Sequence, residues 1–187
     1  MDYKNKEHNK LQIQTTELLR NLKRYDMKTV LQEEEPQFVL IPGKRPVKSM
    51  LKEATKNTHK TIDVIAPWEI CQSTYYHWSV LFKKCLHKGV KIRYIIDTPP
   101  EKNLFQNITK KFRAYPCFEM RYSMAPSLVV VSVYDRKAVA ISSTILTPME
   151  TPDLWITNPP LVALIQDYFE TVWTKAIEID REIIHVQ

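Results

Sequence analysis

The segment SLVVVSVYDRKAVAISS, residues 127–143, decides which fold the chain can adopt. Two runs rich in valine, alanine and isoleucine flank a polar turn at Asp135–Lys137, a pattern typical of two buried strands joined as a hairpin. The segment also carries one acid and two serines within or beside these strands. It therefore raises a chemical question, namely whether the hairpin forms part of an active site.

Short strand patterns alternate with helical patterns on both sides of the hairpin. Gly89 follows basic residues as a C-cap glycine does, and Asn158 before two prolines is a good helix N-cap. This order predicts an α/β sandwich with a mixed β-sheet flanked by helices. Besides the hairpin, the predicted strands are 37–41, 61–67, 91–97, 118–123 and 154–157, and the predicted helices are 46–57, 71–88, 101–114 and one after Asn158. The last helix is expected to bury one apolar face of Leu161, Leu164, Ile165, Tyr168, Phe169, Val172, Trp173 and Ala176.

Residues 1–35 form a helical connector in this interpretation, ahead of an α/β domain at 36–187. Mostly apolar residues recur there at alternating spacings of four and three, which is the a/d pattern of a coiled coil. A stripe this narrow is not stable alone in water, so it needs either a second copy of the chain or the surface of its own domain. Both alternatives stay open. The seam consists of Leu11, Thr15, Leu18, Leu22 and Tyr25.

The composition is that of a globular protein with one sizeable core. The chain has 187 residues, of which 44% are hydrophobic, and its net charge of +6 is unevenly spread. Residues 1–60 and 61–125 each carry +5, whereas residues 126–187 carry −4. No apolar run reaches the ~18 residues that span a bilayer, and the polar N-terminus does not resemble a secretory signal. We therefore expect a cytoplasmic protein without membrane contact, whose basic excess permits nucleic-acid binding but does not establish it.

Several common functional motifs are absent from the sequence. The chain has two glycines, so it lacks the glycine-rich loops with which nucleotide-binding proteins approach phosphate. Its histidines are scattered and its cysteines lack a C-x-x-C spacing, so we expect no metal site and no cofactor. The three cysteines, Cys71, Cys85 and Cys117, are expected to be buried free thiols.

Three segments together resemble a known family: KCLHKGVKIRYIID at 84–97, the hairpin segment at 127–143, and DLWITNPPLVALIQDYFETVWTKA at 153–176. Their order is similar to that of the phospholipase D-like domain in archaeal transcriptional regulators of the TrmB-like family. The resemblance covers about residues 36–178, and the last segment is its most specific part. It implies a phospholipase D-like sandwich for this domain.

Catalytic phospholipase D relatives carry a His-x-Lys-x4-Asp signature at the hairpin, in which histidine attacks phosphorus and lysine holds the phosphate. In this chain Leu128 stands at the histidine position, Val130 at the lysine position and Asp135 at the acid position. Ser142 and Ser143 match the small polar residues after the second strand. Because the reaction needs a nucleophile and a cation at one phosphate, the resemblance implies a degenerate site without enzyme activity. Asp135 then acts as a turn residue whose side chain closes the turn.

A non-catalytic domain of this class still offers a concave surface at the ends of its strands. Trp68 follows one strand, Asp97 ends the next, and Trp155 and Asn158 come near the end of another. We expect these four residues to line a cleft for a small effector. The alternative for the two tryptophans is that they serve as core or rim residues.

The sequence therefore predicts a non-catalytic sensor or interaction domain of a TrmB-like transcription regulator. Family members usually carry a winged helix-turn-helix ahead of the connector. Such a unit needs ~60–70 residues, and we expect that residues 1–35 have no room for it. We accordingly expect a homodimer or a pairing with a regulator chain, a small-molecule effector, and only indirect contact with DNA. Two alternatives stay open: a diverged phospholipase D-like hydrolase, and a basic module associated with nucleic acid.

Overall fold

The computed structural model describes residues 37–97, 112, 114–125, 127, 129–142 and 152–178. Within these ranges the strands form one mixed sheet in the order β1-β7-β6-β5-β2-β3-β4-β8. Strand β2 pairs parallel with β3, and β3 with β4, whereas the pairs β2–β5, β5–β6, β6–β7 and β7–β1 are antiparallel. The strands are β1 (Phe38–Ile41), β2 (Thr61–Ala66), β3 (Lys91–Asp97), β4 (Phe118–Ser123), β5 (Val130–Tyr134), β6 (Ala138–Ser142), β7 (Asp153–Ile156) and β8 (Ile177–Glu178).

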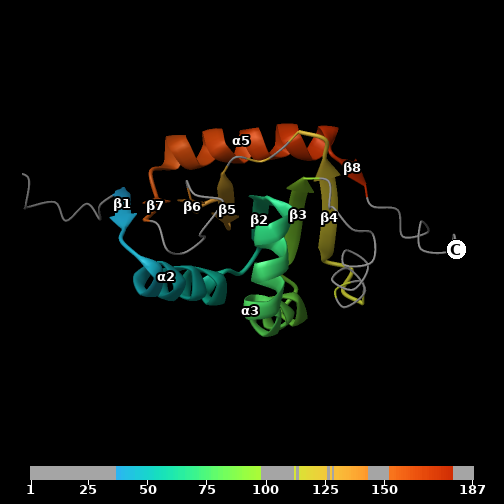
Figure 1. Cartoon of the computed structure of the whole chain (residues 1–187), viewed down its shortest axis with the longest axis horizontal. Helices are drawn as coiled ribbons and strands as arrows, with labels where there is room; N and C mark the ends of the chain where they lie inside the picture. Colours follow the sequence, from blue (N-terminus) through green and yellow to red (C-terminus); the bar gives the residue numbers. More distant parts are fainter. Residues whose placement is uncertain are drawn as a thin grey trace, which may run out of the picture. The chain divides into compact units, whose positions relative to one another are not determined.

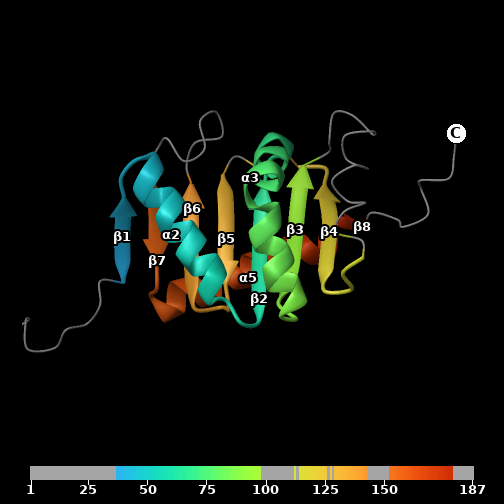
Figure 2. The same cartoon turned by 90° about the horizontal axis from the view of Figure 1, so that it is seen from below.

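Helices cover both faces of this sheet (Figure 1). Helices α2 (Lys44–Asn57) and α3 (Trp68–His87) lie on one face, and α5 (Pro159–Lys175) lies on the other. Figure 2 shows α2 crossing in front of β7 and β6, while α3 lies over β2 and β3. No helix in the described ranges is both long and apolar enough to cross a membrane.

Local sequence sets the ends of two helices. The Asn158 side chain accepts a hydrogen bond from the backbone N–H of Leu161 at 3.2 Å, and prolines begin α5. Gly89 follows α3 with a φ of 81°, a left-handed conformation that glycine adopts without steric cost. Both helix signals expected from the sequence are confirmed.

The connection between β5 and β6 is a tight turn with an unusual composition. Asp135 and Arg136 have φ values of 51° and 56°, and the N–H of Lys137 donates to the carbonyl of Tyr134 at 2.9 Å. Positive φ at both central residues is typical of a type I′ turn, whose twist matches that of the strands it joins. The predicted hairpin is confirmed, without the glycine that such turns usually contain.

Alternate residues along the strands face two separate apolar layers. One layer packs under α2 and α3, and the other packs under α5. This period of two is what a sheet covered on both faces requires, and it confirms the predicted α/β sandwich. The first layer includes Ile62, Val64, Ile92, Tyr94 and Ile96, and the second includes Ile65, Ile95, Val131, Val133 and Val139.

Two helices differ in detail from the prediction. Helix α3 begins at Trp68, directly after β2, rather than at residue 71. In α5, Leu164 and Tyr168 were expected on the buried face but are 63% and 57% exposed. Apolar composition alone does not reveal which stripe of a helix faces the sheet, because apolar residues lie on more than one side of α5. The buried stripe consists of Val162, Gln166, Phe169 and Trp173.

Several predictions fall on parts of the chain that the structure does not describe. The connector at 1–35, with its seam residues, lies outside the described residues, as does nearly all of the predicted helix at 101–114. Leu128 and Ser143 of the hairpin also lie outside them. The three cysteines are free thiols, and Cys71 and Cys85 are buried as expected, whereas Cys117 is only half-buried.

Candidate functional site

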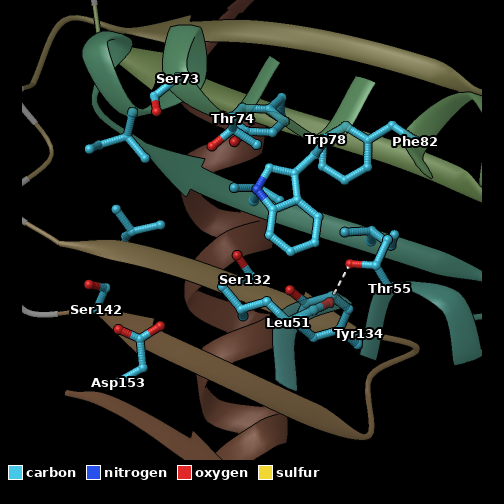
Figure 3. A pocket seen from close by; sticks show the side chains of 15 residues that line it. Leu51, Thr55, Ser73, Thr74, Trp78, Phe82, Ser132, Tyr134, Ser142 and Asp153 are labelled. Atoms are coloured by element: carbon cyan, nitrogen blue, oxygen red, sulfur yellow. Dashed lines mark hydrogen bonds between the residues drawn. The ribbon is translucent and has the colours of Figure 1, made fainter. Parts of the chain in front are cut away.

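A cavity of about 70 Å³ lies between α2 and α3, over the strands β2, β5 and β6 (Figure 3). We call it the Asp153 cavity, after the acid at one end. Its walls are mainly apolar and aromatic, with several hydroxyl groups between them. The lining residues are Leu51, Thr55, Ile62, Val64, Ile70, Ser73, Thr74, Trp78, Phe82, Tyr94, Val130, Ser132, Tyr134, Ser142 and Asp153.

One end of the cavity is formed by a row of three residues on neighbouring strands. Val130 begins β5 and pairs with Ser142, which ends β6, and Ser142 pairs in turn with Asp153, which begins β7. Adjacent strands lie about 4.8 Å apart, so the three residues follow one another across the same edge of the sheet. Figure 3 shows the Ser142 hydroxyl and the Asp153 carboxyl next to each other.

Two polar atoms in this row are buried without a partner. Ser142 and Asp153 are 6% and 3% exposed. The Ser142 hydroxyl lies close enough to interact with the Asp153 carboxyl, but neither Ser142 Oγ nor Asp153 Oδ1 has a partner with good hydrogen-bond geometry among the described residues. Burial raises the pKa of the Asp153 carboxyl above its ordinary value, and the nearby Ser142 hydroxyl partly offsets this rise. An unpaired buried polar group costs about 1–3 kcal/mol. A water or ligand that completes these hydrogen bonds would therefore be stabilising here.

The rest of the cavity is uncharged. Burial raises the pKa of the Tyr134 hydroxyl to about 12 and that of Tyr94 well above its ordinary value, so both are neutral at physiological pH. The rings of Trp78 and Phe82, from α3, face the same space (Figure 3). Asp153 is therefore the only charged residue among the described residues that line the cavity.

The lining lacks the groups with which the phospholipase D signature acts. Val130, which the sequence comparison placed at the lysine position, is one of the lining residues, and none of those that the structure describes is a histidine, lysine, arginine or cysteine. Over the described ranges, no group of three or more His, Cys, Asp or Glu side chains is placed to hold a metal ion. The described lining combines apolar and aromatic walls with hydroxyl groups and one acid.

Asp135, at the acid position of the signature, holds the backbone between α2 and β2. Its carboxylate accepts hydrogen bonds from the N–H groups of His59, Lys60 and Thr61 at 2.9, 2.7 and 2.9 Å. Burial opposes the charged form, but these three donors prevail and lower the pKa of Asp135. The prediction of a turn residue is right about its place. It is wrong about the contact, because the side chain binds a distant segment rather than its own turn.

Trp68 and Asp97 meet where β2 and β3 end. The Asp97 carboxylate accepts a hydrogen bond from the backbone N–H of Trp68 at 2.6 Å, at the start of α3. An acid in this position stabilises the first turn of a helix. The Trp68 side chain is 2% exposed and belongs to the core. Both residues thus support the fold, and the Trp68 ring packs in the core.

Trp155 and Asn158 belong to a different part of the sheet. Three successive antiparallel pairs separate β7 from β2, so β7 ends at the opposite edge from β2 and β3 (Figure 2). The Trp155 ring lies beside that of Tyr134, with centroids 5.9 Å apart, and Asn158 caps α5. The structure therefore does not bring Trp68, Asp97, Trp155 and Asn158 into one cleft, because β7 runs opposite to β2.

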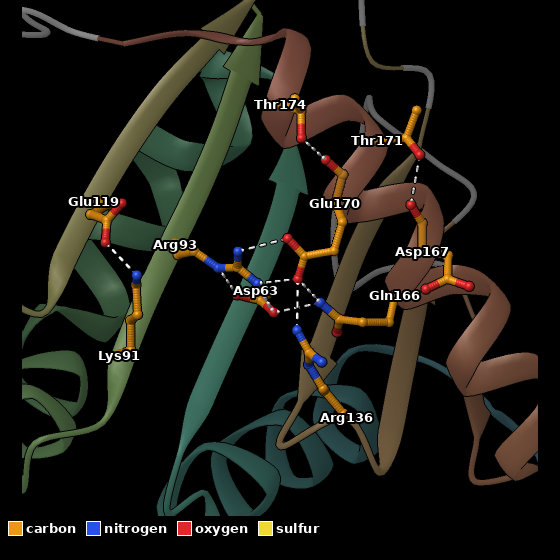
Figure 4. A network of polar contacts seen from close by, with 10 residues as sticks. All are labelled: Asp63, Lys91, Arg93, Glu119, Arg136, Gln166, Asp167, Glu170, Thr171 and Thr174. Atoms are coloured by element: carbon orange, nitrogen blue, oxygen red, sulfur yellow. Dashed lines mark hydrogen bonds and ion pairs between the residues drawn. The ribbon is translucent and has the colours of Figure 1, made fainter.

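A charged network on the other face ties α5 to the sheet (Figure 4). Arg93 donates two hydrogen bonds to Asp63, at 2.7 and 2.8 Å, and two to Glu170, at 2.9 and 2.8 Å. Gln166 donates to both acids, and Arg136 donates to Glu170 at 2.9 Å. Asp63 is fully buried, and a buried charge of this kind persists when it is paired. Because these charges satisfy one another, we assign the network to the fold rather than to ligand binding.

Sequence reasoning missed the pairing of Ser142 with Asp153. Asp153 precedes the LWIT stretch and has the character of a loop residue, while Ser142 matched only a small polar position of the signature. The signal that reveals them is the hairpin itself. If 138–142 and 153–156 are paired as neighbouring strands, their polar ends come together at one edge of the sheet.

No protein-family model matches the chain, and no curated protein matches it in sequence. Solved structures do share its fold. TrmBL2, an archaeal chromatin protein with a novel mode of DNA binding, has a TM-score of 0.61 at 15% identity, over 93% of this chain and 66% of its own. NucT from Helicobacter pylori has a TM-score of 0.61 at 12% identity, over 76% of this chain and 97% of its own. Nuc from Salmonella typhimurium, a phospholipase D family member, has a TM-score of 0.52 at 12% identity, over 76% of this chain and 98% of its own.

These similarities show the fold, and they confirm a phospholipase D-like α/β sandwich with a mixed sheet. The chain spans just under two thirds of the TrmBL2 chain. The same architecture occurs in a phospholipase D family member and in a chromatin protein. The fold therefore does not decide whether this chain is an enzyme, and its function has to be argued from the site.

Proposed function

We propose that this chain is a non-catalytic regulatory domain, the sensor or interaction part of a TrmB-like transcription regulator, with a small effector bound in the Asp153 cavity. The composition of that cavity carries the proposal. Val130 stands where the phospholipase D signature has its lysine, and no other cationic side chain among the described lining residues replaces it. The cavity offers aromatic walls and hydrogen-bonding groups, which are the usual parts of a small-molecule site.

The likeness to TrmBL2 supports a role near DNA. It extends over 93% of this chain, and TrmBL2 is a chromatin protein. In this proposal residues 1–35 connect the domain to a second copy or to a regulator chain, and contact with DNA is indirect. A bound effector acts only if its affinity differs between two arrangements of the partners.

A phosphodiesterase assay tests the absence of catalysis. The purified protein is offered a chromogenic phosphodiester, a phospholipid and single-stranded DNA. The variant Asp153→Asn, which removes the only charge on the described cavity lining, is assayed beside it. We expect both proteins to stay at background, because the described lining has no nucleophile next to a cation.

Two results would contradict this proposal and favour an alternative. Turnover that persists through repurification and falls in the Asp153→Asn variant would indicate a diverged phospholipase D-like hydrolase. Binding to any DNA duplex with a steep salt dependence would indicate a basic module associated with nucleic acid.

A further inference from the structure

The charge of the Asp153 cavity favours a cationic ligand. Asp153 is the only carboxylic acid on the described lining, no basic side chain accompanies it there, and the residue is 3% exposed. A phosphate or carboxylate placed beside it would be stripped of water and repelled, whereas a cation would compensate the buried charge. In the phospholipase D signature a lysine at the position of Val130 holds a phosphate. Here the same row of residues presents an acid and no cation, so the preferred ligand charge is reversed.

The two unpartnered atoms, Ser142 Oγ and Asp153 Oδ1, favour a ligand that donates hydrogen bonds. An ionised Asp153 can only accept hydrogen bonds, and Ser142 Oγ has free acceptor capacity. An ammonium group carries several N–H donors and can therefore serve both atoms at once. Its bond to the carboxylate is charge-assisted, which is the stronger class of hydrogen bond.

The aromatic walls and the volume of the cavity limit the polarity and the size of the rest of the ligand. Trp78, Phe82 and the two lining tyrosines supply aromatic surface, which packs against alkyl groups and attracts cations. A single water needs about 10–15 Å³ on this measure of volume. A cavity of about 70 Å³ therefore has room for a ligand of a few non-hydrogen atoms.

We propose that the Asp153 cavity binds a small organic cation, namely a short primary alkylamine in its ammonium form. The ammonium contacts Asp153 and Ser142, and the alkyl chain lies toward Trp78 and Phe82. This inference rests on the proposed function, since it names the chemical class of the effector at the same cavity. Ordered water is the rival occupant, because it too can complete the hydrogen bonds of both atoms.

The experiment compares probes of similar size and shape but different charge. Propylammonium, 1-propanol and propionate, with inorganic phosphate as a fourth probe, are titrated at constant ionic strength into the full chain. The readout is the indole N–H signal of Trp78 in a proton–nitrogen NMR spectrum, assigned with the variant Trp78→Phe. We expect a saturable shift with propylammonium in the millimolar range, as for other ligands of this size. We expect binding at least about tenfold weaker for 1-propanol, and none for the two anions.

Two matched variants test whether the charge of Asp153 is the one that binds propylammonium. Asp153→Asn keeps the size of the side chain and removes its charge, so it should weaken propylammonium binding at least about tenfold. Asp167→Asn removes an acid from the exposed surface of α5 and should bind like the unmodified chain.

Several results would overturn the proposal. It fails if 1-propanol binds as well as propylammonium, if Asp153→Asn leaves binding intact, or if propylammonium gives no saturable shift of the Trp78 signal. None of these results touches the phosphodiesterase assay, so the non-catalytic role would stand by itself. Binding of phosphate at Trp78 together with phosphodiester turnover would contradict both proposals.

Discussion

Among the single residues, Asp153 is a buried acid, and an ionised carboxyl is costly to bury without full hydrogen bonding. The residue is 3% exposed, burial raises the pKa of its carboxyl, and one carboxyl oxygen has no hydrogen-bond partner of good geometry among the described residues. Unfavourable groups of this kind concentrate at functional sites, where binding requires them. The residue therefore makes opposite contributions to stability and to the proposed binding.

Replacing Asp153 by asparagine should make the ligand-free protein more stable. A carboxyl whose pKa is raised by folding destabilises the protein while it is ionised, and stability returns as the pH falls through the raised value. We expect a gain of about 1 kcal/mol at neutral pH, or about 2–4 °C in Tm, and a smaller gain at mildly acidic pH. Thermal melts followed by circular dichroism, at neutral and at mildly acidic pH, measure the Tm of the variant and of the unmodified chain. A lower Tm for the variant would show that the carboxylate has a stabilising partner.

Asp135 should contribute to stability through its three backbone donors. Asp135→Ala removes their acceptor and places a less tolerant residue at a φ of 51°, so we expect a loss of about 1–2 kcal/mol in urea unfolding. Asp135→Asn keeps one acceptor oxygen and the left-handed preference, and it should lose less. Because folding lowers the pKa of Asp135, its contribution is present above the ordinary carboxyl value and is lost as the pH falls through the lowered one. Equal stability of all three proteins would contradict this role.

At the scale of elements, α5 is held on the sheet by an apolar stripe and by the Arg93 network. Phe169 and Trp173 pack against the sheet, and the Arg93 guanidinium lies 4.7 Å from the centroid of the Phe169 ring. The apolar stripe supplies burial, whereas the fork of hydrogen bonds from Arg93 to Asp63 and Glu170 fixes the position of the helix. Residues from β2, β3 and α5 thus meet at one buried cation.

The Glu170 contact should appear in the acid unfolding of the protein. Hydrogen bonds from Arg93 lower the pKa of Glu170 from 4.5 to about 2, against the opposing effect of burial. A lowered pKa means that the stabilisation is complete above 4.5 and is lost as the pH falls through about 2. We expect the free energy of unfolding of Glu170→Gln to fall less steeply than that of the unmodified chain over this pH interval. The difference should be smaller than the pKa shift of Glu170 implies, because its side chain is 35% exposed and solvent screens the ion pair. Urea unfolding at a series of pH values measures the slope, and an unchanged slope would contradict the prediction.

At the scale of the whole molecule, we propose that residues 1–35 pair two copies of the chain. Their a/d seam lies outside the described residues, so the proposal rests on the sequence pattern alone. Pairing about a two-fold axis is the commonest way for a homo-oligomer to bury such a stripe. It would also give an effector in the Asp153 cavity a way to act on a partner, through the relative position of two domains.

Light scattering tests the pairing directly. The unmodified chain should have about twice the monomer mass of 22.1 kDa, and the double change Leu18→Asp, Leu22→Asp should give a folded monomer. Thr16→Asp with Lys23→Asp introduces two acids off the seam and should leave the dimer intact. A chain that is monomeric at high concentration, or a dimer that survives the seam changes, would show that the connector folds elsewhere or that another face pairs.

Much of the fold could be predicted from the sequence, because strands, helices and their ends depend on neighbouring residues. The hairpin around Asp135, the C-cap at Gly89 and the N-cap at Asn158 are all local features, and the structure has all three. The direction of β7 relative to β2, by contrast, does not depend on neighbouring residues in the sequence. Strand β7 runs opposite to β2 and β3, so its end lies at the other side of the sheet, and the cleft predicted from Trp68, Asp97, Trp155 and Asn158 does not form.

Periodicity and composition were enough to predict the order of the described strands and helices and the sandwich class, and the two glycines alone exclude glycine-rich phosphate loops. Only the tertiary structure decided that Val130, Ser142 and Asp153 form one row beside a cavity. It also decided which stripe of α5 is buried and which backbone Asp135 holds. The physical reason is that strand register and direction are set by contacts between residues far apart in the chain, and a local pattern does not contain those contacts.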